Sequence, residues 1–217
     1  HYSANSDLND LLATLAKSSL PRYRSLSTPT LPEENRFSKQ VLDFNLDEPM
    51  EMAEIPNQGI LFVERRGAIK LFNFTTNQTT LIDSLPVAYQ NEDGLLGLAV
   101  DPNFTDNHWI YLFYSPTTEE PIQRISRFEL AEYQLDRTSE KILLEFPLIR
   151  KCCHSGGGLE FGPDGLLYIG TGDNTNPFES NGFAPIDERP NRALWDAQKS
   201  AANTNDLRGK ILRIQPN

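Results

Sequence analysis

The sequence predicts an all-β protein built from repeated sheets, and three observations support that fold class. From Phe37 onward, short runs of aliphatic, aromatic and β-branched residues alternate with Gly, Pro, Asn and Asp, and no long helical pattern interrupts them. A unit of strand, proline turn and strand occurs three times. Its turn prolines, Pro56, Pro102 and Pro163, are 46 and 61 residues apart. Because propeller blades run to about 40–50 residues with insertions in their loops, we predict a β-propeller rather than a sandwich.

The first 36 residues are predicted to form an arm or linker outside the repeated sheets. A weak helical pattern of leucines, at positions 8, 11, 12 and 15, is followed by a Ser/Thr/Pro-rich run over residues 18–32. That run lacks the apolar periodicity of a packed element. We therefore expect two parts: an arm of residues 1–36 and a partial β-propeller of residues 37–217.

The three repeats predict three pairs of strands. The pairs are residues 50–55 and 60–64, 95–100 and 109–114, and 157–161 and 166–169. At roughly 45 residues a blade, residues 37–217 have room for about four blades. We interpret the last run, Leu207–Ile214, as a strand entering a further unit. Since a propeller loses its free edges only when the ring closes, the chain is expected to be part of a larger ring.

The charge and hydropathy of the chain argue against some classes of partner. The 30 acidic residues outnumber 20 basic ones, which gives a net charge of −10, and 38% of the residues are hydrophobic. This composition supports a sizeable core but does not favour binding to nucleic acid or anionic membranes, both of which need a basic surface. No run approaches the roughly 20 apolar residues of a membrane span. We expect neither a nucleic-acid partner nor a membrane span.

His154 and Asp173 are the strongest candidates for a reactive site. Pro163-Asp164-Gly165 has the composition of a tight turn between two apolar runs, which predicts a hairpin centred near residue 164. Opposed residues of a hairpin lie about 4.5–5.5 Å apart, and this centre brings His154 opposite Asp173. Because a carboxylate there can fix the imidazole tautomer, the pair predicts a general base with its orienting group. A structural histidine at a strand end is the alternative.

Cys152 and Cys153 are the only cysteines, and they directly precede His154. Adjacent Cα atoms are about 3.8 Å apart, below the usual disulfide range of about 4.4–6.8 Å, so a bond between these cysteines would strain the backbone. Two interpretations stay open: two reduced, buried thiols, or a rigid disulfide ring that floors a pocket beside His154. No C-x-x-C spacing is present, which argues against a zinc site.

Four blocks of residues give the chain a resemblance to a known family. The blocks are Leu61–Gly67, Glu92–Phe104, His154–Asp173 and Leu207–Ile214. Their order and spacing make residues 44–217 similar to the soluble quinoprotein glucose dehydrogenases and aldose sugar dehydrogenases, also called glucose/sorbosone dehydrogenases. The resemblance implies a six-bladed propeller, of which this chain covers roughly the first three to four blades. It also implies pyrroloquinoline quinone (PQQ) bound with calcium at the mouth of the central channel.

The same resemblance implies an activity and roles for individual residues. His154 takes the proton from the C1 hydroxyl of a sugar while hydride passes to the quinone, and Asp173 supports His154. The family position that contacts the cofactor, typically Gln, corresponds to Glu92 here, where a carboxylate meets an anionic quinone. An external acceptor then takes the electrons, and the protein is expected to be periplasmic or secreted.

Other expected cofactor contacts surround His154. We hypothesise that a Cys152–Cys153 ring stacks on the quinone, as adjacent cysteines do in unrelated quinoprotein alcohol dehydrogenases. Gly156 is included because its glycine run lets another backbone or a flat ligand approach closely. We assign no metal ligand, since the calcium ligands and cofactor-clamping arginines of this family lie largely in later blades. The remaining blades are therefore an expected partner.

An insert over residues 174–205 follows Asp173 and is expected to gate or line the sugar pocket. Its acidic residues Asp187, Glu188 and Asp196 lack a recognisable calcium-ligand spacing, so we interpret them as turn and salt-bridge residues. Two other function classes stay open. One is a non-catalytic propeller module that binds a carbohydrate or a protein. The other is a hydrolase, for which the sequence offers a His–Asp pair but no nucleophile.

Overall fold

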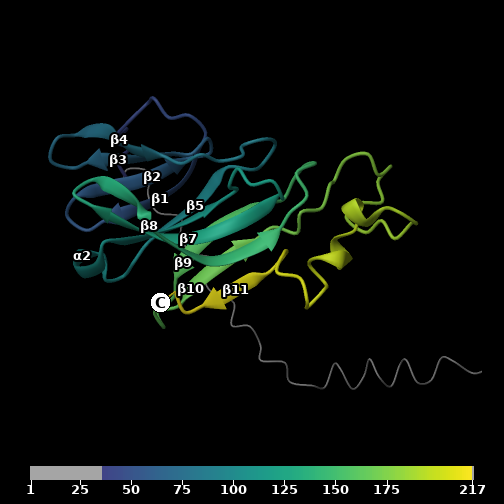
Figure 1. Cartoon of the computed structure of the whole chain (residues 1–217). Coiled ribbons are helices and arrows are strands. Elements are labelled where there is room, and N and C mark those ends of the chain that lie inside the picture. The colour runs from purple at the N-terminus through teal and green to yellow at the C-terminus, as the bar shows by residue number, and fades with distance from the viewer. Residues whose placement is uncertain (1–35, 217) are drawn as a thin grey trace, which may run out of the picture. The chain divides into compact units, whose positions relative to one another are not determined.

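The computed structural model describes residues 36–216 (Figure 1), so the arm predicted for residues 1–36 lies outside the described residues except for Arg36. The chain divides into two compact units, residues 1–40 and 41–217. The elements described below belong to the second unit. None of the described helices is long and apolar enough to cross a membrane.

Three antiparallel sheets follow one another along the chain (Figure 1). The first contains β1 (Pro49–Ile55), β2 (Gly59–Glu64), β3 (Ala68–Asn73) and β4 (Gln78–Ser84). The second contains β5 (Leu95–Val100), β6 (Trp109–Tyr114), β7 (Ile122–Ala131) and β8 (Gln134–Pro147). The third contains β9 (Gly156–Phe161), β10 (Leu167–Thr171) and β11 (Ile211–Ile214). The described helices are short: α2 (Phe104–Asn107), η2 (Ala193–Trp195) and η3 (Ala197–Lys199).

This architecture confirms the all-β prediction, and the three repeated units are the pairs β1–β2, β5–β6 and β9–β10. The interpretation of Leu207–Ile214 as a strand entering a further unit is wrong. β11 pairs with β10 from Leu167↔Ile214 to Gly170↔Ile211, so it is the third strand of the third sheet. The long insert obscured this pairing because it separates two neighbouring strands of one sheet by some forty residues of sequence.

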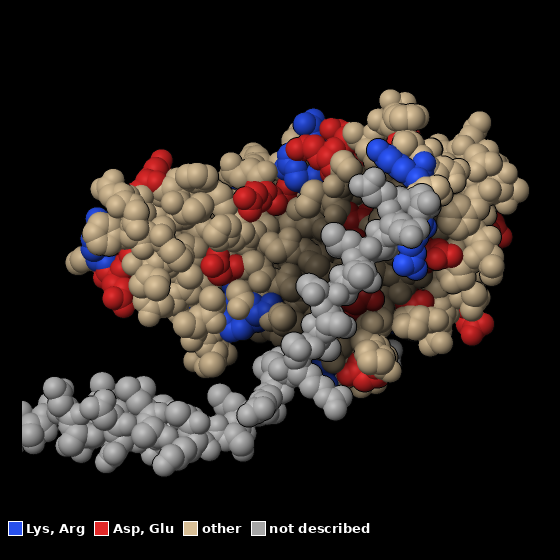
Figure 2. Space-filling model, turned by 180° about the vertical axis from the view of Figure 1, so that it is seen from behind, with Lys and Arg blue, Asp and Glu red and all other residues tan. Residues whose placement is uncertain are grey.

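The first strands of the three sheets share one hollow. β1 contacts β5, and β5 contacts β9. Residues 51–54 of β1, 98–100 of β5 and 159–161 of β9 line a common pocket. Neighbouring blades of a propeller meet in this way around a central channel. Asp and Glu side chains are spread over the face shown in Figure 2, where Lys and Arg form only small groups.

The second sheet is buried on both faces. Successive side chains of a strand point to opposite sides, so Leu95 packs toward the first sheet and Leu96 toward the third. Tyr111 and Phe113, which the alternating aromatic pattern of β6 places in the core, are fully buried. The core therefore consists of two layers of apolar side chains, one on each side of the second sheet.

The second and third sheets approach each other closely where two glycines meet. A Cβ atom at Gly97 of β5 would collide with the backbone carbonyl of Gly157 of β9, and one at Gly157 would press on Leu96. The glycine run of β9 therefore lets another backbone approach, and the backbone of β5 does so at Gly157. Gly158, the next residue, faces open space.

Candidate active site

A one-residue bulge sets the register that brings the candidate residues together. From Leu167↔Phe161 to Gly170↔Gly158, the position numbers of paired residues in β9 and β10 add up to 328. The register then shifts, and Thr171 pairs with Gly156, which lowers the total to 327. His154 and Asp173, two positions beyond this pair, have the same total of 327. The bulge is thus the local irregularity that places them opposite each other.

His154 and Asp173 are in direct contact. The imidazole Nδ1 lies 2.8 Å from Asp173 Oδ1, which also accepts the backbone N–H of Thr175 at 2.9 Å. The side chain of His154 is 40% exposed and that of Asp173 is 23% exposed. Ser200 Oγ donates to the Asp173 carbonyl at 2.7 Å, so the end of the insert returns to this point. With Nδ1 bound to a carboxylate, Nε2 is the nitrogen left to accept a proton.

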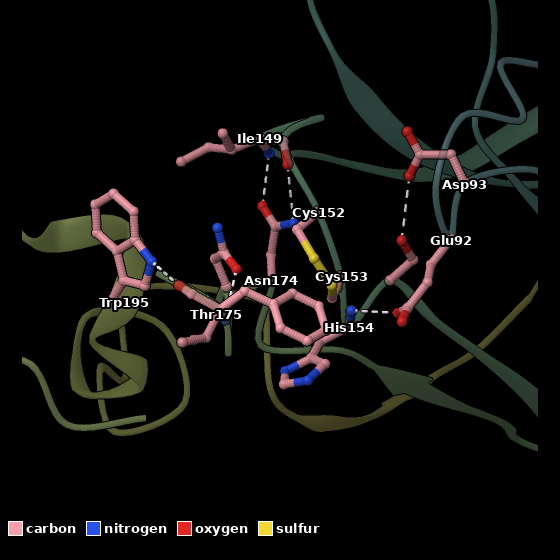
Figure 3. The surroundings of a disulfide bond; sticks show 12 residues. Glu92, Asp93, Ile149, Cys152, Cys153, His154, Asn174, Thr175 and Trp195 are labelled. Carbon is pink, nitrogen blue, oxygen red and sulfur yellow. Dashed lines mark hydrogen bonds between the residues drawn. A yellow bond between two sulfur atoms is a disulfide. The ribbon is translucent and has the colours of Figure 1, made fainter. Parts of the chain in front are cut away.

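Glu92 reaches the same place from the connection between β4 and β5. Its Oε2 accepts the backbone N–H of His154 at 2.5 Å, although the two residues are 62 positions apart (Figure 3). The structure thus brings Glu92 and His154 together, as their proposed roles require. Arg65, at the end of β2, holds the Glu92 connection by donating to the carbonyls of Tyr89, Asn91 and Asp93.

Asp93 forms a buried polar support behind His154. Only 1% of it is exposed, its Oδ1 accepts the hydroxyl of Ser155 at 3.1 Å, and its Oδ2 accepts Arg150 Nε at 3.0 Å. Burial raises the pKa of the Asp93 carboxyl, while the bonds from Ser155 and Arg150 act in the opposite direction. Sequence reasoning missed Asp93 and Arg150. Their only signal was their position in the sequence, since Asp93 follows Glu92 and Arg150 lies two residues before Cys152.

Cys152 and Cys153 form a disulfide with each other beside His154 (Figure 3), with their Cα atoms 3.7 Å apart. Of the two interpretations that the sequence left open, the structure therefore contains the ring. Cys153 is buried and Cys152 partly so. Gly156 lies two residues beyond His154 with φ at 83°, and a Cβ atom there would meet the backbone of β10. The hairpin therefore requires glycine at position 156 whether or not a ligand binds there.

Asp187 organises the insert as an ion-pair centre. Its side chain is fully buried and accepts hydrogen bonds from Arg189, Arg192 and Ser180. This contact set supports the interpretation of Asp187 as a salt-bridge residue. Within residues 36–216, no three His, Cys, Asp or Glu side chains come together as metal ligands would.

The order of the insert is expected to depend on the charge of Asp187. The Arg189 guanidinium holds the pKa of Asp187 well below its usual value of 3.8. Because the folded pKa is lowered, this stabilisation is present above about pH 3.8 and is lost as the pH falls through the folded pKa. Trp195, whose ring lies 3.5 Å from the Arg192 guanidinium carbon, reports on this cluster.

We expect Trp195 fluorescence, followed in a Trp109→Phe background, to stay constant from pH 7 through 3.8 and to shift only at lower pH, as the pH approaches the lowered pKa of Asp187. Asp187→Asn should shift the emission already at pH 7, because a neutral amide cannot hold two guanidinium groups. Glu188→Gln, at the exposed neighbouring residue, is the matched control and should behave as the unmodified chain does. Identical titrations for Asp187→Asn and the control would contradict the prediction.

Comparison with known proteins gives one family match and several relatives. The model of the family described as Glucose / Sorbosone dehydrogenase matches residues 46–217. Quinoprotein glucose dehydrogenase B of Acinetobacter calcoaceticus is 28% identical over 191 residues, which cover 82% of this chain and 39% of that protein. Hedgehog-interacting protein of Homo sapiens is 34% identical over 93 residues, which cover 38% of this chain and 13% of that protein.

A solved structure extends the likeness to the fold. The PQQ-bound form of aldose sugar dehydrogenase from Streptomyces coelicolor superposes with a TM-score of 0.65 at 25% identity. The match covers 82% of this chain and 47% of that one. The chain thus spans less than half the length of these relatives.

Proposed function

Because this chain belongs to the glucose/sorbosone dehydrogenase family, we propose that it takes part in the PQQ-dependent oxidation of an aldose or related sugar at C1. The electrons go to an external acceptor. We further propose that blades beyond residues 36–216 complete the site. A periplasmic or secreted location is part of the proposal, and it is supported by the Cys152–Cys153 disulfide, since disulfides persist mainly in oxidising compartments.

The contact between His154 Nδ1 and Asp173 Oδ1, at 2.8 Å, carries the proposal. Asp173 keeps the proton on Nδ1 and stabilises the cation that forms when Nε2 accepts a second proton. Nε2 belongs to a half-exposed ring, so the C1 hydroxyl of a bound sugar can reach it. His154 is then the general base and Asp173 its orienting partner. Bound PQQ supplies the hydride acceptor.

The described residues fit PQQ in part. A half-exposed imidazole and the Cys152–Cys153 ring lie together at the end of β9, which suits a flat ligand. Gly156 is the third proposed contact and Glu92 the fourth, although the Glu92 carboxylate repels an anionic cofactor. Within residues 36–216, no three acidic, His or Cys side chains lie close enough together to bind calcium. We propose that the calcium ligands and the cations that hold the PQQ carboxylates come from the completing blades.

Glu92→Gln is expected to tighten PQQ binding by about 1.4- to fivefold. The Gln side chain keeps an oxygen to accept the His154 N–H but removes a negative charge beside an anionic ligand. The size follows from the ~0.2–1 kcal/mol typical of exposed charge pairs, because Glu92 is exposed. Titration of PQQ followed by absorbance measures the change. Glu132→Gln, in the turn between β7 and β8, is the control, and an equal gain there would show that only net charge matters.

The function is tested by adding PQQ and calcium to the full-length protein and following aldose-dependent dye reduction. We expect reduction that needs both PQQ and an aldose. A parallel calorimetric titration measures PQQ binding by itself. PQQ binding without sugar-dependent reduction would contradict the oxidation at C1, and loss of both signals would contradict the quinoprotein proposal.

A second candidate is a non-catalytic module that binds a protein or a carbohydrate. The observation that favours it is the 34% identity to hedgehog-interacting protein, together with the carboxylate of Glu92 at the proposed cofactor contact. Failure to bind PQQ in the titration above would favour this candidate.

A further inference from the structure

The side chain of Asn174 closes the loop that delivers His154. Its Oδ1 accepts the backbone N–H of Ile149 at 2.6 Å, and its Nδ2 donates to the carbonyls of Ile149 at 3.2 Å and Cys153 at 3.4 Å (Figure 3). Only 6% of Asn174 is exposed. One amide group therefore joins both ends of the segment from Ile149 to Cys153, which contains the disulfide ring.

The backbone of Asn174 holds the other side of His154. Its N–H donates to the His154 carbonyl at 3.2 Å, and it is bonded through its peptide group to Asp173. The carbonyl of Cys153 thus accepts from the Asn174 side chain, and the carbonyl of His154 itself accepts from the Asn174 backbone N–H. Both residues have left-handed backbones, with φ at 61° for His154 and 56° for Asn174. Such a backbone persists only where its surroundings determine it.

We propose that Asn174 is a positioning residue for His154, which fixes the direction of the imidazole relative to Asp173. The proposal rests on the role of His154 as general base. Asn174 touches neither sugar nor cofactor in this scheme. It acts by holding the backbone on both sides of His154, because the direction of a side chain follows from its backbone, and a displacement of about 1 Å at a reacting group can cost about 10²-fold in rate.

Asn174→Gly separates this role from a general contribution to stability. Glycine tolerates the left-handed backbone and keeps the N–H bond to His154, but it removes the amide that joins Ile149 to Cys153. Asn181→Gly is the matched control, since Asn181 is an exposed residue of the insert with φ at 53°. We expect kcat to fall about 10- to 100-fold in Asn174→Gly with little change in the sugar KM, and no change in Asn181→Gly.

A second readout does not depend on catalysis. The sequence contains three histidines, so the ¹⁵N signals of the His154 ring can be assigned by NMR with variants of the other two, His1 and His108. We expect one tautomer, with the proton on Nδ1, in the unmodified protein and in Asn181→Gly. Asn174→Gly should give a mixture of tautomers. This measurement remains informative even if the protein does not oxidise sugars, so failure of the inference is distinguishable from failure of the proposed function.

Asn174→Asp adds a pH signature that loss of stability alone does not produce. An ionised carboxylate places negative oxygens against the carbonyls of Ile149 and Cys153, whereas a protonated one can donate to one of them. Within the pH range in which the imidazole is neutral, we expect the fraction of the single His154 tautomer to be higher where this buried carboxyl is protonated and lower where it is ionised. If Asn174→Gly and Asn174→Asp lower the melting temperature but leave the His154 tautomer and kcat unchanged, Asn174 is a structural clamp and the inference is wrong.

Discussion

Replacement of His154 by Asn is expected to lower kcat for sugar oxidation by about 10²–10⁴-fold, the usual contribution of a positioned general base. Asn tolerates the left-handed backbone, with φ at 61°, that His154 adopts, so the change removes the base without straining the loop. PQQ affinity and the melting temperature should stay close to those of the unmodified protein. Steady-state dye reduction and a PQQ titration measure the two effects separately.

His108→Asn is the control for this experiment. His108 follows α2 with φ at 56°, and its ring packs against Phe104 with the ring centroids 5.7 Å apart. The Glu92 connection leads into Leu95, which pairs with Tyr114 at the end of β6, whereas His108 precedes the start of that strand. Because His108 lies at the opposite end of the sheet from Glu92, its loss should leave kcat unchanged. Equal kcat values for the unmodified protein and His154→Asn would show that another group accepts the proton.

Gly97→Ala is expected to destabilise the fold by about 3 kcal/mol or more, at or above the upper end of the usual cost of overpacking. The added Cβ atom would collide with the carbonyl of Gly157, which is backbone and cannot move aside as a flexible side chain can. The collision separates β5 from β9 and thereby disturbs the apolar layer between the second and third sheets. Soluble yield and the midpoint of denaturant unfolding measure the effect.

Gly158→Ala, next to Gly157 on β9 but facing open space, provides the matched control. A Cβ atom at Gly158 meets nothing within 4 Å, so we expect its unfolding midpoint to differ little from that of the unmodified protein. Replacement of Gly by Ala at a compatible site typically stabilises by about 0.4–1 kcal/mol. Normal stability of Gly97→Ala would mean that the two sheets do not approach as closely as described.

The sequence predicted the parts of the fold that local chemistry determines. The turn at Pro163-Asp164-Gly165 fixes the register of β9 and β10, and register in a hairpin follows from its turn. Spacing from this turn therefore brought His154 and Asp173 to within one position of each other, whereas the bulge at Thr171 that completes their pairing gave no signal in the sequence. The repeated strand pairs were predictable for the same reason, since each consists of two apolar runs joined by a short turn.

Contacts between distant segments were not predictable in this way. The bond from His154 to Glu92 and the bonds from Arg65 to the Glu92 connection depend on how neighbouring sheets pack. The same holds for the pairing of β11 with β10 across the insert. Asn174 escaped notice because an Asn after a strand is an ordinary turn residue, and only the fold shows which backbone groups its amide binds.

The connection that carries Glu92 leads into the second sheet, whereas His154 leads into the third. The blades of a propeller are similar units, yet the hydrogen bond between His154 and Glu92 joins two of them. Exchange of one blade between relatives would separate Glu92 from His154, and so would recombination at the boundary between the second and third sheets. Productive crossovers should therefore fall outside residues 92–154, for example in β3 or β4, the outer strands of the first sheet. The connections before β5 and before β9 therefore have to come from the same parent protein.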